Sequence, residues 1–401
     1  MATISIQDGA AIRRERSYRG PAVLSAGFRP FFLLGAAWAA IAVPVWLAAY
    51  VHGYALPGAL PAMLWHAHEM IYGFALASVT GFLLTAIPNW TGRLPIRGVP
   101  LAVLVSLWLA GRVALLFSSV LGAPAAAALD LAFAVVLIAA VATEVTAARS
   151  FHNLPVVATL GLLLAGNALV HLHALDIAYS GALGNRIGIG TLIALISLIG
   201  GRLVPSFTRN WLARERPEVA APAPHDRVDT VCLLLIVAGL VAWVAVPDSQ
   251  AASAMAIAAG LAAAVRLSRW RGLATWRAPL LFVLHVGYAW VALGLLLIGL
   301  NGLLAWAPPG APLHALTVGA IGTMTLAVMT RASLGHTGRP LVAGRGTIAI
   351  YVLVTLAALL RVAAPFFGAQ MAEITALAGL AWSGAFGLFA ILYAPLLLRS
   401  K

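Results

Sequence analysis

Long apolar runs, separated by short polar, glycine or proline clusters, dominate this chain from residue 31 onward. Each run is long enough to cross the roughly 30 Å of hydrocarbon in a bilayer as an α-helix. Because lipid offers the backbone no hydrogen bonds and the runs lack the alternation of β-barrel strands, we predict an all-α, polytopic integral membrane bundle. Twelve membrane-spanning helices are expected, near residues 31–51, 64–88, 99–120, 125–147, 155–176, 186–206, 228–246, 250–266, 278–300, 312–332, 346–364 and 371–397.

Basic residues fall mainly at one end of these spans. The 401 residues are 62% hydrophobic and 9% charged, with a formal net charge of +13. In a soluble protein that charge would suggest a nucleic-acid partner, but here it has a topological explanation. If both termini are cytoplasmic, 20 of the 25 Lys and Arg residues lie on the cytoplasmic side. This distribution follows the positive-inside rule, so we expect membrane lipid and no nucleic acid as the surroundings.

The chain divides into a basic cytoplasmic segment, residues 1–30, and a single transmembrane domain, residues 31–401. Arg13, Arg14, Arg16 and Arg19 precede the first span without a short apolar core and a small-residue cleavage site. We therefore interpret the segment as a cytoplasmic anchor and not as a cleaved signal peptide. The single cysteine, Cys232, excludes a disulfide framework and a thiolate metal site.

Histidines gather at the opposite, outer end of the predicted bundle. Histidine is the side chain most used to bind haem iron, copper and zinc. An isolated histidine near the headgroups is usually an interfacial polar group, but six on one side favour a metal or haem centre. The six are His52, His66, His68, His171, His173 and His314.

Four of these histidines form two His-x-His pairs, at the start of span two and at the end of span five. Residues two apart on a helix are rotated by about 200°, so the members of each pair point to opposite faces. Each pair can therefore serve two neighbouring centres, or one centre and a residue that orients its ligand. If there are two centres, we expect His66 and His173 at one and His68 and His171 at the other. Additional candidate metal ligands are His52, His314 and Met70.

Intramembrane acids and hydroxyls are candidates for catalytic proton transfer, because they are costly in lipid unless they have a role. Glu69 and Tyr72 lie in span two. Glu69 is expected to donate protons, to ligate a metal, or to orient His66, with which it shares a helix face. A purely structural alternative is an ion pair with Arg186.

Two further cofactor-binding candidates lie deep within spans. His285, in span nine, is a candidate axial ligand or proton relay, with a hydrogen bond to another helix as the equal alternative. Arg112, in span three, needs a partner of negative charge. A haem propionate, Asp130 or Glu144 would serve, and the sequence does not choose between them.

Several long motifs resemble the signature blocks of the NnrS family. They are Trp65–Met70 continuing through Gly81–Gly92, Gly201–Thr208 after span six, and Gly319–Arg331 running to Gly335–Arg339. The resemblance implies a bacterial inner-membrane protein associated with nitric oxide metabolism and nitrosative stress, containing haem (haem b) and copper. His336 lies within one of these motifs, but the resemblance does not imply which residues are the haem or copper ligands.

The favoured function is a haem- and copper-containing centre near the periplasmic face that binds or reduces nitric oxide. Reduction would make the protein a nitric oxide reductase-like oxidoreductase with a quinol or cytochrome as electron donor. The alternatives are a non-catalytic nitric oxide binding or stress-protection protein, and a transporter of metal or haem. Haem-copper oxidases are comparable at the level of fold alone, since spans six and seven here contain no histidine.

Overall fold

The computed structural model describes residues 18–308 and 310–399, so Arg13, Arg14 and Arg16 of the predicted basic segment lie outside the described residues. Within that part of the chain the regular elements are all helical. Twelve helices are long and apolar enough to cross a membrane, which confirms the predicted number and the all-α class. The assignment of both termini to the cytoplasm stays a prediction.

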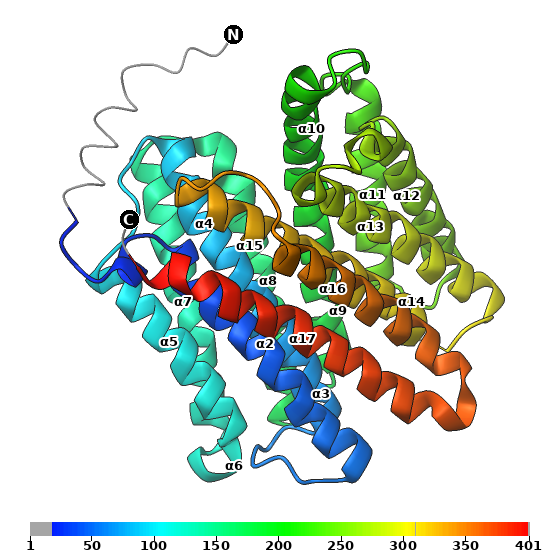
Figure 1. The fold of residues 1–401 in the computed structure, drawn as a ribbon. Coiled ribbons are helices and arrows are strands. Elements are labelled where there is room, and N and C mark those ends of the chain that lie inside the picture. The colour runs from blue at the N-terminus through cyan, green and yellow to red at the C-terminus, as the bar shows by residue number, and fades with distance from the viewer. Residues whose placement is uncertain (1–17, 309, 400–401) are drawn as a thin grey trace.

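Nine of the spans are built around one uninterrupted α-helix (Figure 1). The fifth is extended at its start by the 3-10 turn η3 (Phe151–Asn153). Their observed boundaries lie within a few residues of the predicted ones for most spans. These helices are α2 (Phe28–His52), α5 (Val99–Leu116), α7 (Ala123–Ala147), α8 (Leu154–Ala174), α11 (Arg227–Ala245), α12 (Gln250–Ser268), α13 (Pro279–Leu304) and α16 (Arg345–Ala363). The last span contains α17 (Met371–Leu398).

Three spans are interrupted by π-helical segments, in which the backbone is one residue wider per turn. They are the second, sixth and tenth spans, and in each of them at least 61% of an apolar 18-residue stretch is buried. Span two joins α3 (Ala62–His68), η2 (Glu69–Ala75) and α4 (Leu76–Thr91); span six joins α9 (Gly181–Leu195), η4 (Ile196–Gly200) and α10 (Gly201–Glu215). Span ten joins α14 (Gly310–His314), η6 (Ala315–Gly322) and α15 (Thr323–His336). Because α9 contacts both η2 and η6, the interrupted spans meet at the centre of the bundle.

Span six is longer than the sequence pattern predicts, because α10 continues to Glu215, beyond the predicted end near residue 206. Its polar side chains can be hydrated beyond the hydrocarbon, so nothing stops the helix there. It ends one residue before Arg216, which precedes Pro217 and has left the helical conformation (φ −146°, ψ 60°). The residue before proline is sterically excluded from the α region.

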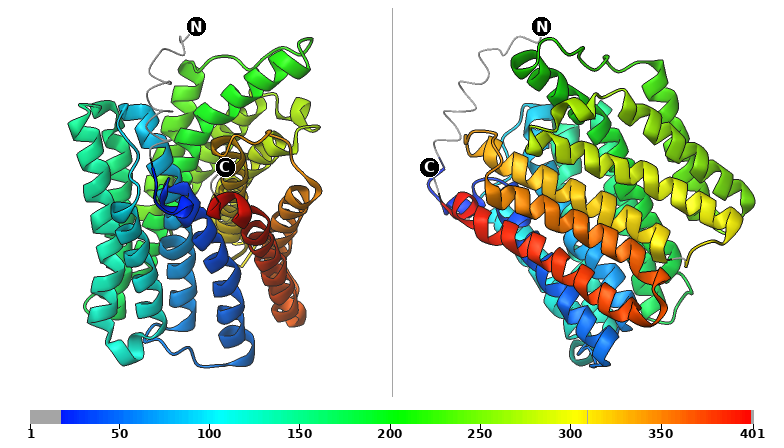
Figure 2. Two further views of the ribbon diagram at one scale, coloured as in Figure 1. Left: turned by 60° about the vertical axis from the view of Figure 1, so that its left-hand side comes forward. Right: turned by 45° about the vertical axis from the view of Figure 1, so that its right-hand side comes forward.

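The first and last spans lie side by side and close the bundle (Figures 1 and 2). Arg29, near the start of α2, donates hydrogen bonds to the backbone oxygens of Leu396, Leu397 and Arg399 at 3.0–3.1 Å. The carbonyls of Leu396 and Leu397 belong to the last turn of α17 and that of Arg399 follows the helix, so none of the three has a helical partner. Arg29 therefore holds the two ends of the described chain at the same end of the bundle.

Replacing Arg29 with Ala should lower the thermal unfolding midpoint in detergent, because three carbonyl acceptors lose a charged donor. Individual side-chain hydrogen bonds in membrane proteins contribute about 0.6–1.7 kcal/mol, so a loss of about 2 kcal/mol is expected. The matched control is Arg19→Ala, at an exposed position before the first span. Equal midpoints for the two variants would contradict the role given to Arg29.

Candidate metal centre in the membrane bundle

The π-helical segment η2 makes room for a buried ion pair. A Cβ atom at Gly73 would lie 2.5 Å from Arg112 Nη1 and 2.6 Å from Glu69 Oε2, so only glycine fits without displacement. The Trp108 indole N–H donates to the Gly73 carbonyl at 3.0 Å. Because the turn is wider and Gly73 has no side chain, the Arg112 guanidinium can pack directly against the backbone of span two.

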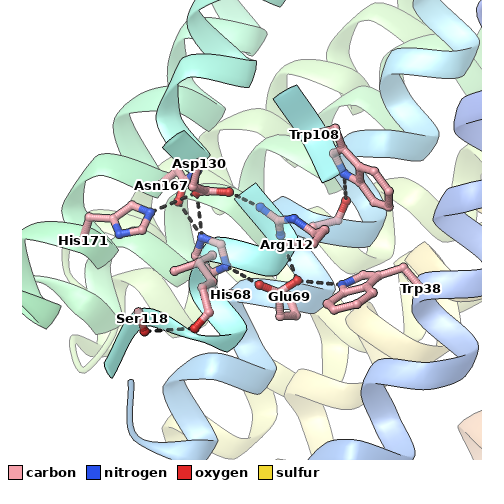
Figure 3. Close-up of polar contacts among 11 residues, drawn as sticks. Trp38, His68, Glu69, Trp108, Arg112, Ser118, Asp130, Asn167 and His171 are labelled. Carbon is pink, nitrogen blue, oxygen red and sulfur yellow. Dashed lines mark hydrogen bonds and ion pairs between the residues drawn. The ribbon is translucent and has the colours of Figure 1, made fainter. Parts of the chain in front are cut away.

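Asp130, on α7, is the hub of a polar cluster within the bundle (Figure 3). Its Oδ2 lies 2.9 Å from His171 Nε2, 3.1 Å from His68 Nε2 and 2.7 Å from Asn167 Nδ2. Its Oδ1 is paired with Arg112. None of these five residues is more than 4% exposed, so the cluster is shielded from solvent.

Glu69 completes the cluster at the first residue of η2. Its Oε2 accepts hydrogen bonds from the Trp38 indole at 2.6 Å and from Arg112 Nη1 at 2.8 Å, while Oε1 lies 3.2 Å from His68 Nδ1. Glu69, Arg112, Asp130 and His68 thus form a closed ring in which acids and bases alternate. We call these four residues the charge ring.

The charge ring decides between the alternatives that the sequence left open. Arg112 pairs with Asp130 and with Glu69, whereas Glu144 pairs with Arg93 at 2.5 Å. The ion pair of Glu69 with Arg186 is wrong, because Arg186 donates instead to the Val244 carbonyl at 3.3 Å. Glu69 contacts the ring of His68 and not that of His66, since η2 begins at Glu69 and changes the helical register there.

Three side chains of the cluster can converge on one metal ion. His68, Asp130 and His171 each offer a ligand atom, and these atoms all lie within 4.8 Å of one another. Two imidazoles and a carboxylate are a donor set suited to copper or zinc. His171 also lines a small recess with Leu60, Leu115, Ser118 and Ala126, which has room for about one water molecule.

His66 lies in a second environment, away from the charge ring. Its ring stacks on Trp46 with centroids 4.1 Å apart, and it lies within electrostatic range of His314 and Arg361. His314 Nδ1 lies 2.5 Å from the Gly310 carbonyl oxygen. Span two therefore presents its two histidines to different neighbours, as a rotation of about 200° requires.

The structure brings His68 and His171 together, with ring centroids 5.3 Å apart, but does not bring His173 to His66. His173 lies against Tyr179, at 5.1 Å between ring centroids, and a Cβ on Gly181 would contact its ring. It faces the connection that follows α8, because it lies in the last turn of that helix.

The remaining candidates lie outside the cluster. Tyr72 packs 5.5 Å from the His68 ring, but its hydroxyl donates to the Gly184 carbonyl at 2.6 Å. His285 lies near the opposite end of the bundle, where Nε2 is 3.2 Å from Thr208 Oγ1 and Nδ1 is 3.2 Å from the Leu281 carbonyl oxygen. His52 is exposed at the end of α2, and Met70 is a half-buried packing residue.

The cluster also contains three residues that the sequence pattern did not assign to it: Asp130, Asn167 and Trp38. Of these, only Asp130 was predicted to interact with another candidate, as one possible partner for Arg112. Two of the three could have been found from the sequence. Asp130 and Asn167 are isolated polar residues within apolar spans, which marks them as site candidates. Nothing in the local pattern identifies Trp38, because its indole reaches Glu69 only through the packing of α2 on span two.

Fold and cluster together define a polytopic helical membrane protein with a buried histidine–carboxylate centre. The model of one family, described as NnrS protein, matches residues 22–401. The chain belongs to this family, which makes it a nitric-oxide-associated membrane protein. A comparison with curated proteins finds no match.

Gly73→Ala should break the Glu69–Arg112 pair, because the added methyl group would overlap both side chains. Separating a buried pair typically costs about 3–5 kcal/mol, so a large fall in thermal stability or in folded yield is expected. Gly161→Ala is the control, since a Cβ there meets nothing within 4 Å in another membrane helix. If the two variants are equally stable, Gly73 does not make room for the ion pair.

Proposed function

We propose that this protein binds copper through His68, Asp130 and His171, binds haem b through His66 and His314, and binds or reduces nitric oxide at the copper-binding cluster. The proposed location is a bacterial inner membrane, with the cluster near the periplasmic face. The observation that carries the proposal is the convergence of two imidazoles on the Asp130 carboxylate inside the bundle.

Charge balance supports a bound cation at the cluster. Two carboxylates, Glu69 and Asp130, face one guanidinium, Arg112, which leaves one negative charge. Both ring nitrogens of His68 face acceptor oxygens, Nδ1 toward Glu69 and Nε2 toward Asp130 and Asn167. Such a ring is satisfied if both nitrogens carry protons or if one of them binds a metal ion. Uncompensated charge is costly in this low-dielectric environment, so either a doubly protonated His68 or a bound metal cation balances it, and we propose the metal cation.

Copper fits this donor set because imidazole is a preferred ligand of copper and Cu(II) accepts mixed nitrogen and oxygen ligands. When bound, copper supplies one-electron redox chemistry and a position where nitric oxide can bind. The other residues orient the ligands. Arg112 holds Asp130 Oδ1, which leaves Oδ2 directed toward the two histidines, and Glu69 fixes the ring of His68 through Nδ1.

Glu69 is the better proton carrier of the two acid–base candidates. Its Oε1 lies 3.2 Å from His68 Nδ1, within reach of a proton exchange. The Tyr72 hydroxyl is engaged with the Gly184 carbonyl, in a slot where a Cβ on Gly166 or Gly188 would collide with it. We therefore assign Glu69 to proton exchange and Tyr72 to packing against His68.

The recess beside His171 offers a small neutral molecule a route to the cluster. It is lined largely by aliphatic side chains and is sized for about one water molecule, which suits a diatomic ligand. Nitric oxide is uncharged and dissolves in lipid. Its approach from the hydrocarbon therefore needs no polar channel.

Haem fits the environment of His66 and His314. The His314 Nδ1 contact with the Gly310 carbonyl is satisfied when Nδ1 carries the proton, which leaves Nε2 free as a ligand nitrogen. The buried His66 Nδ1 has no hydrogen-bond partner in the described residues. Catalytic reduction of nitric oxide would require electrons from a quinol or cytochrome donor.

The copper proposal is tested by metal analysis of the detergent-purified protein. We expect about one copper ion per chain in the wild type, and at least a tenfold loss of copper affinity in His171→Ala. His173→Ala is the matched control, because it alters the same helix two residues away and outside the cluster. Equal copper content in both variants would overturn the assignment.

Nitric oxide titration of the same samples separates binding from turnover. Consumption of nitric oxide with added reductant, lost in His171→Ala, supports reduction at the cluster. A stable complex without consumption supports the binding or stress-protection alternative. A protein that exchanges copper or haem across vesicles without responding to nitric oxide supports the transporter alternative.

A further inference from the structure

Buried polar atoms without partners gather around His66. Eleven such side-chain atoms occur in the described residues, and four of them belong to one region. They are Trp46 Nε1, Trp65 Nε1, His66 Nδ1 and Arg361 Nη1. Leaving a buried donor unpaired costs about 1–3 kcal/mol, so their concentration in one place indicates that a ligand supplies the acceptors.

Arg361 carries a positive charge that no acidic side chain in the described residues is seen to balance. Its electrostatic neighbours are His66, His314 and the hydroxyl group of Tyr50. Two fully buried arginines of the spans differ, since Arg112 pairs with two carboxylates and Arg266 lies 3.5 Å from Asp229. An unpaired guanidinium inside a membrane span is costly and marks a functional site.

Aromatic rings form a wall of the same region. Tyr50, Trp46 and His66 stack in series, with centroids 4.9 Å and 4.1 Å apart and interplanar angles of 18° and 23°. Trp46 and Trp65 belong to one buried apolar cluster. The region therefore combines flat apolar surface, imidazole nitrogens and hydrogen-bond donors around a cation.

We propose that Arg361, with the indole N–H of Trp46, binds the anionic oxygens of a ligand at this site, carboxylate or phosphate in chemistry. The proposal rests on the proposed haem site, where the acceptors are the carboxylates of haem. The phosphate of an anionic lipid headgroup is the other source of the same chemistry, since Arg361 lies near the end of its span. Arg361 acts through charge-assisted hydrogen bonds that Lys reproduces in charge but not in geometry.

The test uses the full-length protein in detergent, freed of bound haem and titrated with haem and with haem dimethyl ester. The ester keeps the iron and the ring but lacks the free carboxylates. We expect the wild type to bind haem about tenfold or more tightly than the ester, the equivalent of one charge-assisted contact. Arg361→Ala should lose this preference while binding the ester as the wild type does, and Arg361→Lys should recover part of it.

Arg331→Ala is the matched control, because Arg331 is another half-buried arginine of a span but lies over the Phe207 ring, 4.2 Å from its centroid. It should keep the wild-type preference. If the wild type binds haem and its ester equally, carboxylate binding by Arg361 is overturned while haem binding at His66 and His314 stands, and the phosphate source is tested next.

If the protein binds neither haem nor its ester, the haem part of the proposed function is wrong. The ligand tested next is then the lipid phosphate. The probe is then phosphatidylglycerol retained through purification, measured by mass spectrometry. Retention by the wild type and Arg331→Ala but not by Arg361→Ala supports the inference with a lipid phosphate. Equal retention overturns it. Copper content at His171 is read in parallel and is expected to be unchanged in every Arg361 variant.

Discussion

The charge ring of Glu69, Arg112, Asp130 and His68 is the interaction on which the packing of spans two, three and four depends. Each of these groups alone would be costly in a bilayer, because neither lipid nor apolar side chains can solvate it. In the ring, acidic and basic side chains alternate, so every carboxylate oxygen accepts from a donor. Breaking any member leaves another charge uncompensated, so spans two, three and four are fixed relative to one another.

Glycine and the π-helical turn are the backbone features that permit this ring. Gly73 admits the Arg112 guanidinium to span two, and a Cβ on Gly111 would lie 3.0 Å from both the Cα and the Oδ1 of Asp130. Such close approach places the polar groups within hydrogen-bonding distance. The site and the helix packing therefore depend on each other, because a larger side chain at Gly73 or Gly111 would push the helices apart and separate the charges.

The two histidines of span two contribute to different sites. His68 is held among carboxylates and an amide, an environment that favours a cation. His66 lies within electrostatic range of Arg361, which has no acidic partner in the described residues, and this environment favours an anionic ligand. Under the proposed function, a small cation and a large acidic cofactor would therefore have separate places along one helix. The recess lined by His171 lies on the cation-favouring side.

The sequence by itself determined the helical class, the twelve spans and the gathering of histidines near one end, because hydrophobic length and helical periodicity are local properties. It also identified His68, His171, Glu69 and Arg112 as candidates, since polar residues in apolar runs are conspicuous. Only the tertiary structure decided that Asp130 joins them, that Glu69 faces His68, and that His66 lies beside Arg361, about 300 residues away in the chain. Those pairings depend on which helices are neighbours and on how the π-helical segments shift the register, and no local pattern encodes either.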